Sequence, residues 1–322
     1  MDIYNNFPLK DIIYYKIGGS AKFVLKILKR EDLLEALEFV KKNKIRKVLP
    51  VGLGSNLLVS DNFFDGAVLW FAKSPKNEII LDSDGLVKTF ASTLLDELIQ
   101  FSFDNNLIGL EWAGGLPSTV GGALRGNAGA FGGEIKDNLY KAEIFELLDN
   151  GEFVQKEMMM SDLQFSYRNS IVKKNKNLII GNCFFKLEKT DKKALENAKN
   201  IYFSYIEYRN QNHPVDFPSC GSVFKNITKK EEVSKILSIW VDVKDLVENN
   251  WHRKVSMGYV IKRLGFSNFT IGGAKVSERH ANYIVNFNNA KFDDVFSIIE
   301  KIKDKFDDVF GFLPEVEVEI VK

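Results

Sequence analysis

The residues of this chain that could do chemistry lie in six short motifs, of which the first two are glycine-rich. Residues 51–61 read VGLGSNLLVSD and follow a short apolar run, so their backbone N–H groups could approach phosphate oxygens. Residues 109–133 hold nine of the 23 glycines, with hydroxyl and amide side chains between them. A tight structural turn is the alternative for each loop, and Leu57 stands where a Rossmann fingerprint needs its third glycine. The candidates for binding an anionic cofactor are Gly52, Leu53, Gly54, Ser55, Asn56, Leu57, Gly115, Pro117, Ser118, Thr119, Gly121, Gly122, Asn127 and Gly129.

The next two motifs carry side chains suited to a substrate. FSYRNS at 165–170 places Arg168 among aromatic and hydroxyl residues, in a chain with only eight arginines. Its planar guanidinium suits a carboxylate or a phosphate, although a surface salt bridge is the simpler interpretation. PSCGSVFKN at 218–226 adds three polar side chains that could share one site: Ser222, Lys225 and Asn226.

Three other reactive side chains are weaker candidates. Cys220 has no histidine beside it in the sequence, so we expect an inert, buried thiol. His280, in the fifth motif at 271–282, is by itself more often structural than catalytic. The sixth motif, LPEVEVEI at 313–320, alternates as a strand does, which predicts Glu315 on one face with the next two glutamates. An exposed acidic face is the alternative.

Periodic apolar residues predict the elements that must position these motifs. A helix is expected over 31–43, and a strand over 47–51 leads into the first glycine loop. Ser92 or Thr93 is expected to cap a second helix. A final helix is expected from about Asp293, with Gly311 as its C-cap.

Composition excludes several functional classes. The 322 residues include 44 Lys and Arg against 43 Asp and Glu, and a net charge of +1 argues against a basic nucleic-acid or membrane-surface binder. No apolar run reaches the roughly 18 residues of a membrane span, and no signal peptide is visible, so the cytoplasm is expected. Two cysteines and three dispersed histidines predict no disulfide framework and no metal site.

Taken together and in order, the six motifs closely resemble the MurB family of UDP-N-acetylenolpyruvoylglucosamine reductases, from about residue 10 to the C-terminus. Each motif alone is weak evidence for the family, but six motifs in the same order are specific evidence. The resemblance implies an α+β fold, with a vanillyl-alcohol-oxidase-type (PCMH-like) FAD-binding domain in two subdomains at 1–73 and 74–190. A substrate-binding domain would follow at 191–322, with a helical insertion at about 227–255.

The resemblance also implies a chemistry. FAD and NADPH would be used to reduce the enolpyruvyl ether of a UDP-sugar to UDP-N-acetylmuramate, a peptidoglycan precursor. The two glycine loops would hold FAD. Arg168 would stabilise the developing enolate, and Ser222 would donate a proton to the adjacent carbon. Glu315 would help neutralise the substrate carboxylate, which requires it to be protonated or hydrogen-bonded near Arg168. Three residues would contact the substrate: Tyr167, Lys225 and Asn226.

Some features depart from the family or leave alternatives open. After Asn226 the family usually continues with proline, whereas here Ile227 begins the insertion, and Lys262 stands where an acidic residue is more frequent. The short stretch between Gly133 and Tyr167 resembles the second family type, which lacks a mobile tyrosine loop. A sugar or alcohol oxidase on the same fold and a non-catalytic nucleotide-binding module are the competing hypotheses. We expect a monomer that acts on small molecules.

Overall fold

The computed structural model describes residues 1–75, 78–83, 85–251 and 253–322. Their contacts form two compact units. Unit 1 comprises Met1–Phe7, Ser20–Leu53 and Phe63–Gln211, and unit 2 comprises Pro8–Gly19, Gly54–Asn62 and Asn212–Lys322. These units do not follow the expected border at residue 190. One reason is that Tyr202, beyond that border, packs edge-to-face on Phe103 and hydrogen-bonds Asp96, both in unit 1.

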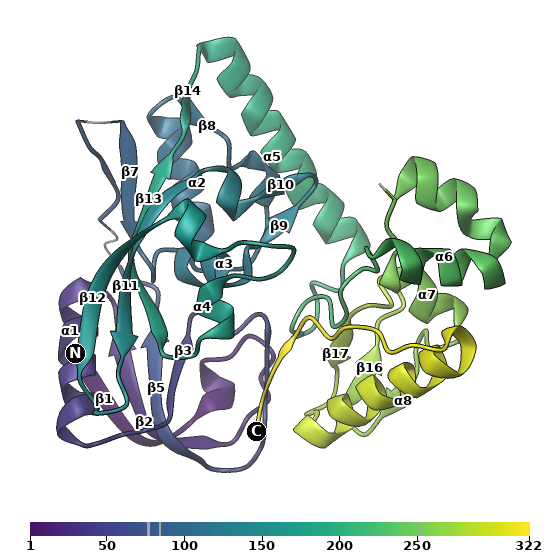
Figure 1. The fold of residues 1–322 in the computed structure, drawn as a ribbon, viewed down its shortest axis with the longest axis horizontal. Helices are drawn as coiled ribbons and strands as arrows, with labels where there is room; N and C mark the ends of the chain where they lie inside the picture. The colour runs from purple at the N-terminus through teal and green to yellow at the C-terminus, as the bar shows by residue number, and fades with distance from the viewer. Residues whose placement is uncertain (76–77, 84, 252) are drawn as a thin grey trace. The chain divides into compact units, whose positions relative to one another are not determined.

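Unit 1 is built on two sheets (Figure 1). In the first, β5 is parallel to both β2 and β3. Its strands, in spatial order, are β1 (Asp2–Pro8), β2 (Ser20–Ile27), β5 (Phe64–Phe71) and β3 (Val48–Val51). The second sheet is antiparallel and ordered β12 (Phe153–Met159), β11 (Leu139–Leu147), β13 (Leu178–Lys186), β7 (Leu86–Phe90) and β6 (Ile80–Leu81). Two small sheets pair β8 (Leu107–Ile108) with β14 (Glu188–Lys189), and β9 (Gly129–Ala130) with β10 (Gly133–Glu134).

The helices of unit 1 bury apolar stripes against these sheets. They are α1 (Arg30–Lys42), α2 (Leu95–Asp104), α3 (Val120–Gly126), α4 (Ile171–Lys174) and α5 (Lys192–Asn212), with 3₁₀ turns at Glu111–Ala113, Ile135–Asp137 and Met160–Leu163. The helix expected over 31–43 is confirmed as α1. The prediction that Ser92 or Thr93 caps α2 was wrong, because Leu94 is the N-cap residue. The Ser92 hydroxyl donates to the Leu28 carbonyl instead, and Thr93 accepts from Thr89.

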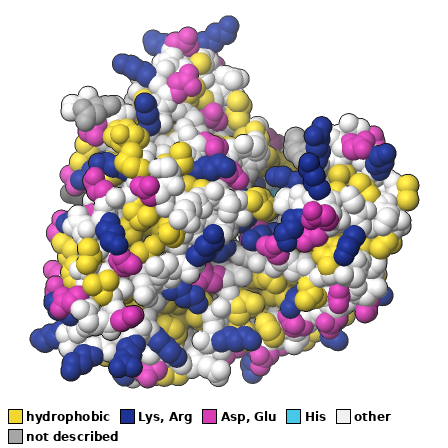
Figure 2. Space-filling view, in the orientation of Figure 1, with side chains coloured by type: hydrophobic (Ala, Val, Ile, Leu, Met, Phe, Trp, Pro, Cys, Tyr) yellow, Lys and Arg dark blue, Asp and Glu magenta, His cyan; other side chains and the backbone are white. Residues whose placement is uncertain are grey.

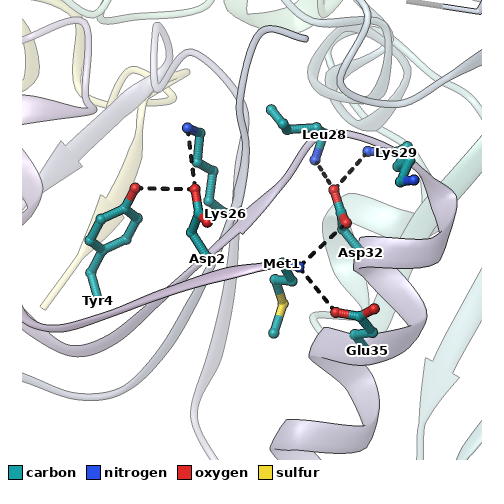
Figure 3. Close-up of polar contacts among 8 residues, drawn as sticks. All are labelled: Met1, Asp2, Tyr4, Lys26, Leu28, Lys29, Asp32 and Glu35. Carbon is teal, nitrogen blue, oxygen red and sulfur yellow. Dashed lines mark hydrogen bonds and ion pairs between the residues drawn. The ribbon is translucent and has the colours of Figure 1, made fainter.

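Ionic contacts join Met1, just before β1, to the first two turns of α1 (Figure 3). The amino group of Met1 lies 3.1 Å from Glu35 Oε2 and 3.7 Å from Asp32 Oδ1. Asp32 Oδ2 also accepts the backbone N–H groups of Leu28 and Lys29, at 2.9 and 3.3 Å. An acidic residue in a first helical turn is favourable because it satisfies otherwise free N–H groups.

Unit 2 combines one large helix with short strands (Figure 1). Strand β4 (Leu57–Val59) pairs in parallel with β18 (Glu319–Val321), and β15 (Thr270–Ile271), β16 (Ala274–Val276) and β17 (Ile284–Asn286) form an antiparallel sheet. Its helices are α6 (Lys230–Ile239), α7 (Met257–Arg263) and α8 (Phe292–Phe310), with 3₁₀ turns at Leu9–Asp11 and Val241–Val243. The final helix and its C-cap are confirmed, since Gly311 follows α8 with φ 69°. The strand expected over 313–320 is shorter, because regular pairing begins at Glu319.

Backbone hydrogen bonds join the two ends of the segment expected to be an insertion. Ile227 and Val255 exchange backbone hydrogen bonds of 3.1 and 2.9 Å. Between them lie α6, a 3₁₀ turn and one π-helical turn at Leu246–Asn250. Trp240 packs on Phe310 of α8, with ring centroids 4.8 Å apart. His252 lies outside the described residues.

Charges of both signs are mixed over the face of the molecule seen in Figure 2, as the near-zero net charge requires. Across the described ranges, no helix is both long and apolar enough to cross a membrane.

Candidate functional site

Four of the predicted cofactor residues line one cavity in unit 1. Gly52 follows β3, whereas Thr119, Gly121 and Gly122 lie at the start of α3. The cavity has a volume of about 370 Å³, including space open to solvent. Arg125, which sequence reasoning did not single out, adds a cation to the lining. The remaining walls are formed by Pro50, Val51, Phe71, Ala91, Val172, Leu178, Ile179 and Ile180.

The glycines are required by the close approach of chain segments around this cavity. A Cβ atom on Gly52 would lie 2.4 Å from Thr119 Oγ1, and one on Gly121 would lie 2.8 Å from the Cβ of Ala91. Thr119 caps α3, because its Oγ1 accepts the N–H of Gly122 at 3.1 Å. Mostly apolar walls with a few polar groups are typical of cofactor pockets, so this lining fits part of a flavin nucleotide.

The first glycine loop continues beyond this cavity into unit 2. Gly54 adopts φ +64°, and a Cβ there would lie 3.0 Å from the Cα of Ile13. The amide of Asn56 donates to the Glu317 carbonyl at 3.4 Å, and Leu57 opens strand β4. Within unit 1, Leu53 and Ser118 are partly exposed, and Gly115 and Pro117 are exposed. The structure therefore places some predicted cofactor residues in each unit.

Arg168 lies in a tight turn of unit 1. Ser166 and Asn169 exchange backbone hydrogen bonds of 3.1 and 3.0 Å around it. Its φ of 56° is left-handed, a conformation that costs a non-glycine residue about 1–3 kcal/mol unless its surroundings impose it. The guanidinium donates to the Gly129 carbonyl at 2.5 Å and lies 5.0 Å from the Tyr167 ring centroid.

Asn127, which was predicted to bind the cofactor, is fully buried at the C-cap of α3. Its amide nitrogen donates to Ser166 O and to Glu134 Oε2, both at 3.1 Å. Its amide oxygen accepts the backbone N–H of Lys136 at 3.3 Å. These protein partners use both ends of the amide.

Backbone pairing in unit 2 brings Ser222, Lys225 and Glu315 into one neighbourhood. Lys225 N donates to Glu315 O at 2.9 Å, and Glu317 N donates to Val223 O at 2.7 Å. Ser222 is partly buried and follows Gly221, whose φ is +75°.

Two polar side chains fix the rest of this motif. Asn226 accepts the N–H of Met257 at 3.0 Å through its side-chain oxygen, at the start of α7. Asn282 pairs with both backbone groups of Phe224, at 2.9 and 2.8 Å. The motif at 218–226 is therefore held from two sides.

The carboxylate of Glu315 lies between two lysines. Its Oε2 is 3.0 Å from Lys225 Nζ, and its Oε1 is 3.2 Å from Lys229 Nζ. The hydrogen bond from Lys225, and secondarily that from Lys229, holds the pKa of Glu315 below its ordinary value. Glu315 is therefore ionised at neutral pH, rather than in the protonated form that one version of its role requires. Lys229 was missed because it lies in the segment expected to be an insertion, three positions after the end of the motif at 218–226.

The two remaining candidate side chains, Cys220 and His280, make contacts within unit 2. Cys220 is buried, and burial raises the pKa of its thiol to about 12, which keeps it protonated. His280 lies next to His213, with ring centroids 5.3 Å apart, although 67 positions separate them in the sequence. Burial lowers the pKa of His280, and its Nδ1 accepts the N–H of Asn282 at 3.3 Å.

Comparison with known proteins identifies the class of protein to which these features belong. Residues 21–155 match the family model of an FAD-binding domain. Together with the α+β fold and the cavity, this match defines a flavin-binding protein with a separate C-terminal unit. Residues 213–321 match the C-terminal domain model of UDP-N-acetylenolpyruvoylglucosamine reductase.

The chain belongs to the UDP-N-acetylenolpyruvoylglucosamine reductase (MurB) family, and the resemblance in its motifs is confirmed. The enzyme of that name from Caldicellulosiruptor bescii is 32% identical over 324 residues, covering 100% of this chain and 91% of the relative. The one from Thermosipho melanesiensis is 33% identical, covering 99% and 96%. The crystal structure of the reductase from Thermus caldophilus shares the fold, with a TM-score of 0.71, 24% identity, and coverage of 100% and 98%.

Proposed function

We propose that this protein catalyses the NADPH-dependent, FAD-mediated reduction of UDP-N-acetylglucosamine enolpyruvate to UDP-N-acetylmuramate. The observation that carries the proposal is the similarity, over almost the full chain, to relatives that bear the name of this reductase. The oxidase and binding-module alternatives are not favoured, because those relatives span both units.

FAD would supply the hydride that reaches the substrate, after its own reduction by NADPH. The residues that would hold the cofactor in unit 1 are those lining the cavity between β3 and α3. The exposed backbone of Gly52 and Gly122 would face the anionic groups, and Arg125 would add positive charge. Of the further loop residues predicted from the sequence, all but Asn127 remain part of this proposal.

We propose that the guanidinium of Arg168 stabilises the enolate charge that develops as hydride reaches the alkene. A fixed cation lowers the barrier most when it need not reorganise during the reaction. The tight turn at 166–169 and the bond to Gly129 O support such a fixed position. Tyr167, whose ring lies against the guanidinium, would contact the same substrate.

Ser222 would donate a proton to the carbon next to the one that receives hydride. A hydroxyl is a weak acid, so this step depends on the high basicity of the enolate. Glu315, being ionised, would act by holding Lys225 and Lys229 in place. Lys225 and Asn226 would bind anionic parts of the substrate.

Separate measurement of the two half-reactions tests the proposal. Purified protein should be yellow, and its NADPH oxidation should depend on the enolpyruvyl sugar nucleotide. In Ser222→Ala, NADPH should bleach the flavin at the wild-type rate, whereas reoxidation by the substrate should slow by about 10²–10⁴-fold. A protein that cannot be loaded with FAD, or one that consumes oxygen with an alcohol instead, would overturn the proposal.

Three finer features remain predictions: a cytoplasmic location, a monomeric state and the family type that lacks the tyrosine loop. Light scattering of the FAD-loaded protein, with a mass near 36.7 kDa expected, tests the monomer.

A further inference from the structure

The segment 127–129 contacts the turn that carries Arg168 at two separate points. The side-chain amide of Asn127 donates to the Ser166 carbonyl, which opens the turn that carries Arg168. Two residues further along, the Gly129 carbonyl accepts from the Arg168 guanidinium. The backbone and the charged end of Arg168 are therefore tied to the same short stretch of chain.

We propose that Asn127 is a positioning residue for Arg168, and that it acts by holding the 166–169 turn rather than by contacting the cofactor. This inference rests on the catalytic role proposed above for Arg168. It assigns Asn127 a different function from the one that its place in a glycine-rich loop predicts.

Burial makes the hydrogen bond of Asn127 hard to replace. The side chain has 0% exposure, so its amide exchanges none of its hydrogen bonds with solvent. The Ser166 carbonyl also accepts the N–H of Asn169, so loss of the amide removes one of its two hydrogen bonds, at a cost of about 0.5–1.5 kcal/mol, whereas the left-handed conformation of Arg168 costs about 1–3 kcal/mol. Loss of the amide therefore favours release of the turn into a more relaxed backbone conformation.

The amide is itself fixed by two partners outside the turn. Glu134 accepts its second N–H and also pairs with the Lys136 ammonium at 2.8 Å. The backbone N–H of Lys136 donates to its oxygen at 3.3 Å. These contacts set the orientation of the amide, so the N–H that reaches Ser166 is directed by the protein.

Gly129 completes the arrangement by leaving room for the guanidinium. A Cβ atom there would lie 3.3 Å from Arg168 Nη1 and 2.7 Å from Glu134 Cγ. A methyl group at this position would press on the guanidinium, and also on the Gly133 carbonyl and on Glu134, which accepts from the Asn127 amide. This gives a second way to displace Arg168 that keeps the Asn127 side chain.

The experiment compares Asn127→Asp with Asn182→Asp in the FAD-loaded protein. Both changes replace an amide that donates to a glutamate in unit 1, but Asn182 donates to Glu143 and does not contact the turn. We expect Asn127→Asp to keep its FAD content, visible spectrum and rate of bleaching by NADPH. Reoxidation by the enolpyruvyl substrate should slow by roughly tenfold to a hundredfold, the cost of an ångström-scale misplacement. Asn182→Asp should leave that rate unchanged.

Combination with Arg168→Lys separates positioning from other roles. If Asn127 acts through Arg168, the double variant should reoxidise no more slowly than Arg168→Lys alone. Loss of FAD, or equal slowing of both half-reactions, would show a cofactor contact and overturn the inference. A normal reoxidation rate in Asn127→Asp, with a slow one in Arg168→Lys, would also overturn it while leaving the proposed function intact. A normal rate in Arg168→Lys would instead remove the catalytic role on which the inference rests.

A folding defect in Asn127→Asp would not prevent the test. Gly129→Ala should slow reoxidation more than bleaching by NADPH, because it crowds the guanidinium and Glu134 while keeping the Asn127 donor. Wild-type reoxidation in Gly129→Ala would contradict the claim that this segment sets the position of Arg168.

Discussion

Each unit uses one buried asparagine to hold a segment that carries a candidate catalytic residue. Asn127 in unit 1 has 0% exposure and donates to the carbonyl of Ser166, two residues before Arg168. Asn282 in unit 2 has 3% exposure and donates to the carbonyl of Phe224, two residues after Ser222. The residue type and the bond are the same, but the surroundings differ.

The segment of unit 2 that carries Ser222 is held by additional hydrogen bonds. Asn282 pairs with both backbone groups of Phe224, as a neighbouring strand would, and its own carbonyl accepts the N–H of Val223 at 2.8 Å. Backbone bonds to Glu315 and Glu317 hold the same segment from another side. The turn around Arg168 instead combines a left-handed residue with a side-chain donor. We infer that the segment carrying Arg168 in unit 1 depends more on a single buried amide, whereas the segment carrying Ser222 in unit 2 is held by several hydrogen bonds.

The largest effect is expected from replacing Arg168 in unit 1. Arg168→Lys keeps the positive charge but loses the planar fork and the geometry set by the Gly129 carbonyl. We expect reoxidation by substrate to slow by about 10²–10³-fold, the usual cost of removing a transition-state donor. Stopped-flow absorbance of the flavin measures both half-reactions in one preparation. An equal loss in the NADPH step would show damage to the cofactor site instead.

A smaller effect is expected from Asn282→Asp in unit 2. The change removes the donor to Phe224 O, but the bonds to Glu315 and Glu317 remain. We expect a loss of about 1–3 kcal/mol in unfolding free energy, with a slowing of reoxidation smaller than in Asn127→Asp. Denaturant unfolding and stopped-flow kinetics test the two parts. If Asn282→Asp were the slower enzyme, the inferred difference between the units would be wrong.

The smallest effect concerns the exposed ionic contacts of unit 2. Lys225 and then Lys229 hold the pKa of Glu315 below its ordinary value, so the ionised form persists to lower pH. In Lys229→Gln the pKa should rise, and the acid-side fall in reoxidation rate should move to higher pH. At neutral pH the change should stay below about fivefold and shrink with added salt, because the pair is exposed.

The pH profile of Lys229→Gln is compared with that of Lys230→Gln, one residue further along and also exposed. A depressed carboxyl pKa contributes stability above its unfolded value, and this contribution is lost as the pH falls through the folded value. The acid side of the melting-temperature profile should therefore change in the same direction as the rate. Identical profiles for the two variants would show that Lys229 does not act on Glu315.

Much of the fold was predictable because local patterns dictated it. The apolar period predicted α1 and α8, and Gly311 marked the end of α8. The cap of α2 was not predictable, because the hydroxyl of Ser92 bonds to Leu28, 64 positions away, instead of to its own helix. Polar side chains that can bond either locally or at long range are where local rules fail.

The sequence by itself determined the family and the residues proposed to react, because six motifs in one order preserve the chemistry of a flavin reductase. It could not decide what holds those residues. Asn127 donates across 39 positions to Ser166, and Lys229 reaches Glu315 from a segment outside the motifs. Such contacts depend on which groups, distant in the sequence, are brought within hydrogen-bonding distance, and that is a property of the folded chain. Only the tertiary structure showed that the Asn127 amide bonds to the turn that carries Arg168, the observation from which we infer its positioning role.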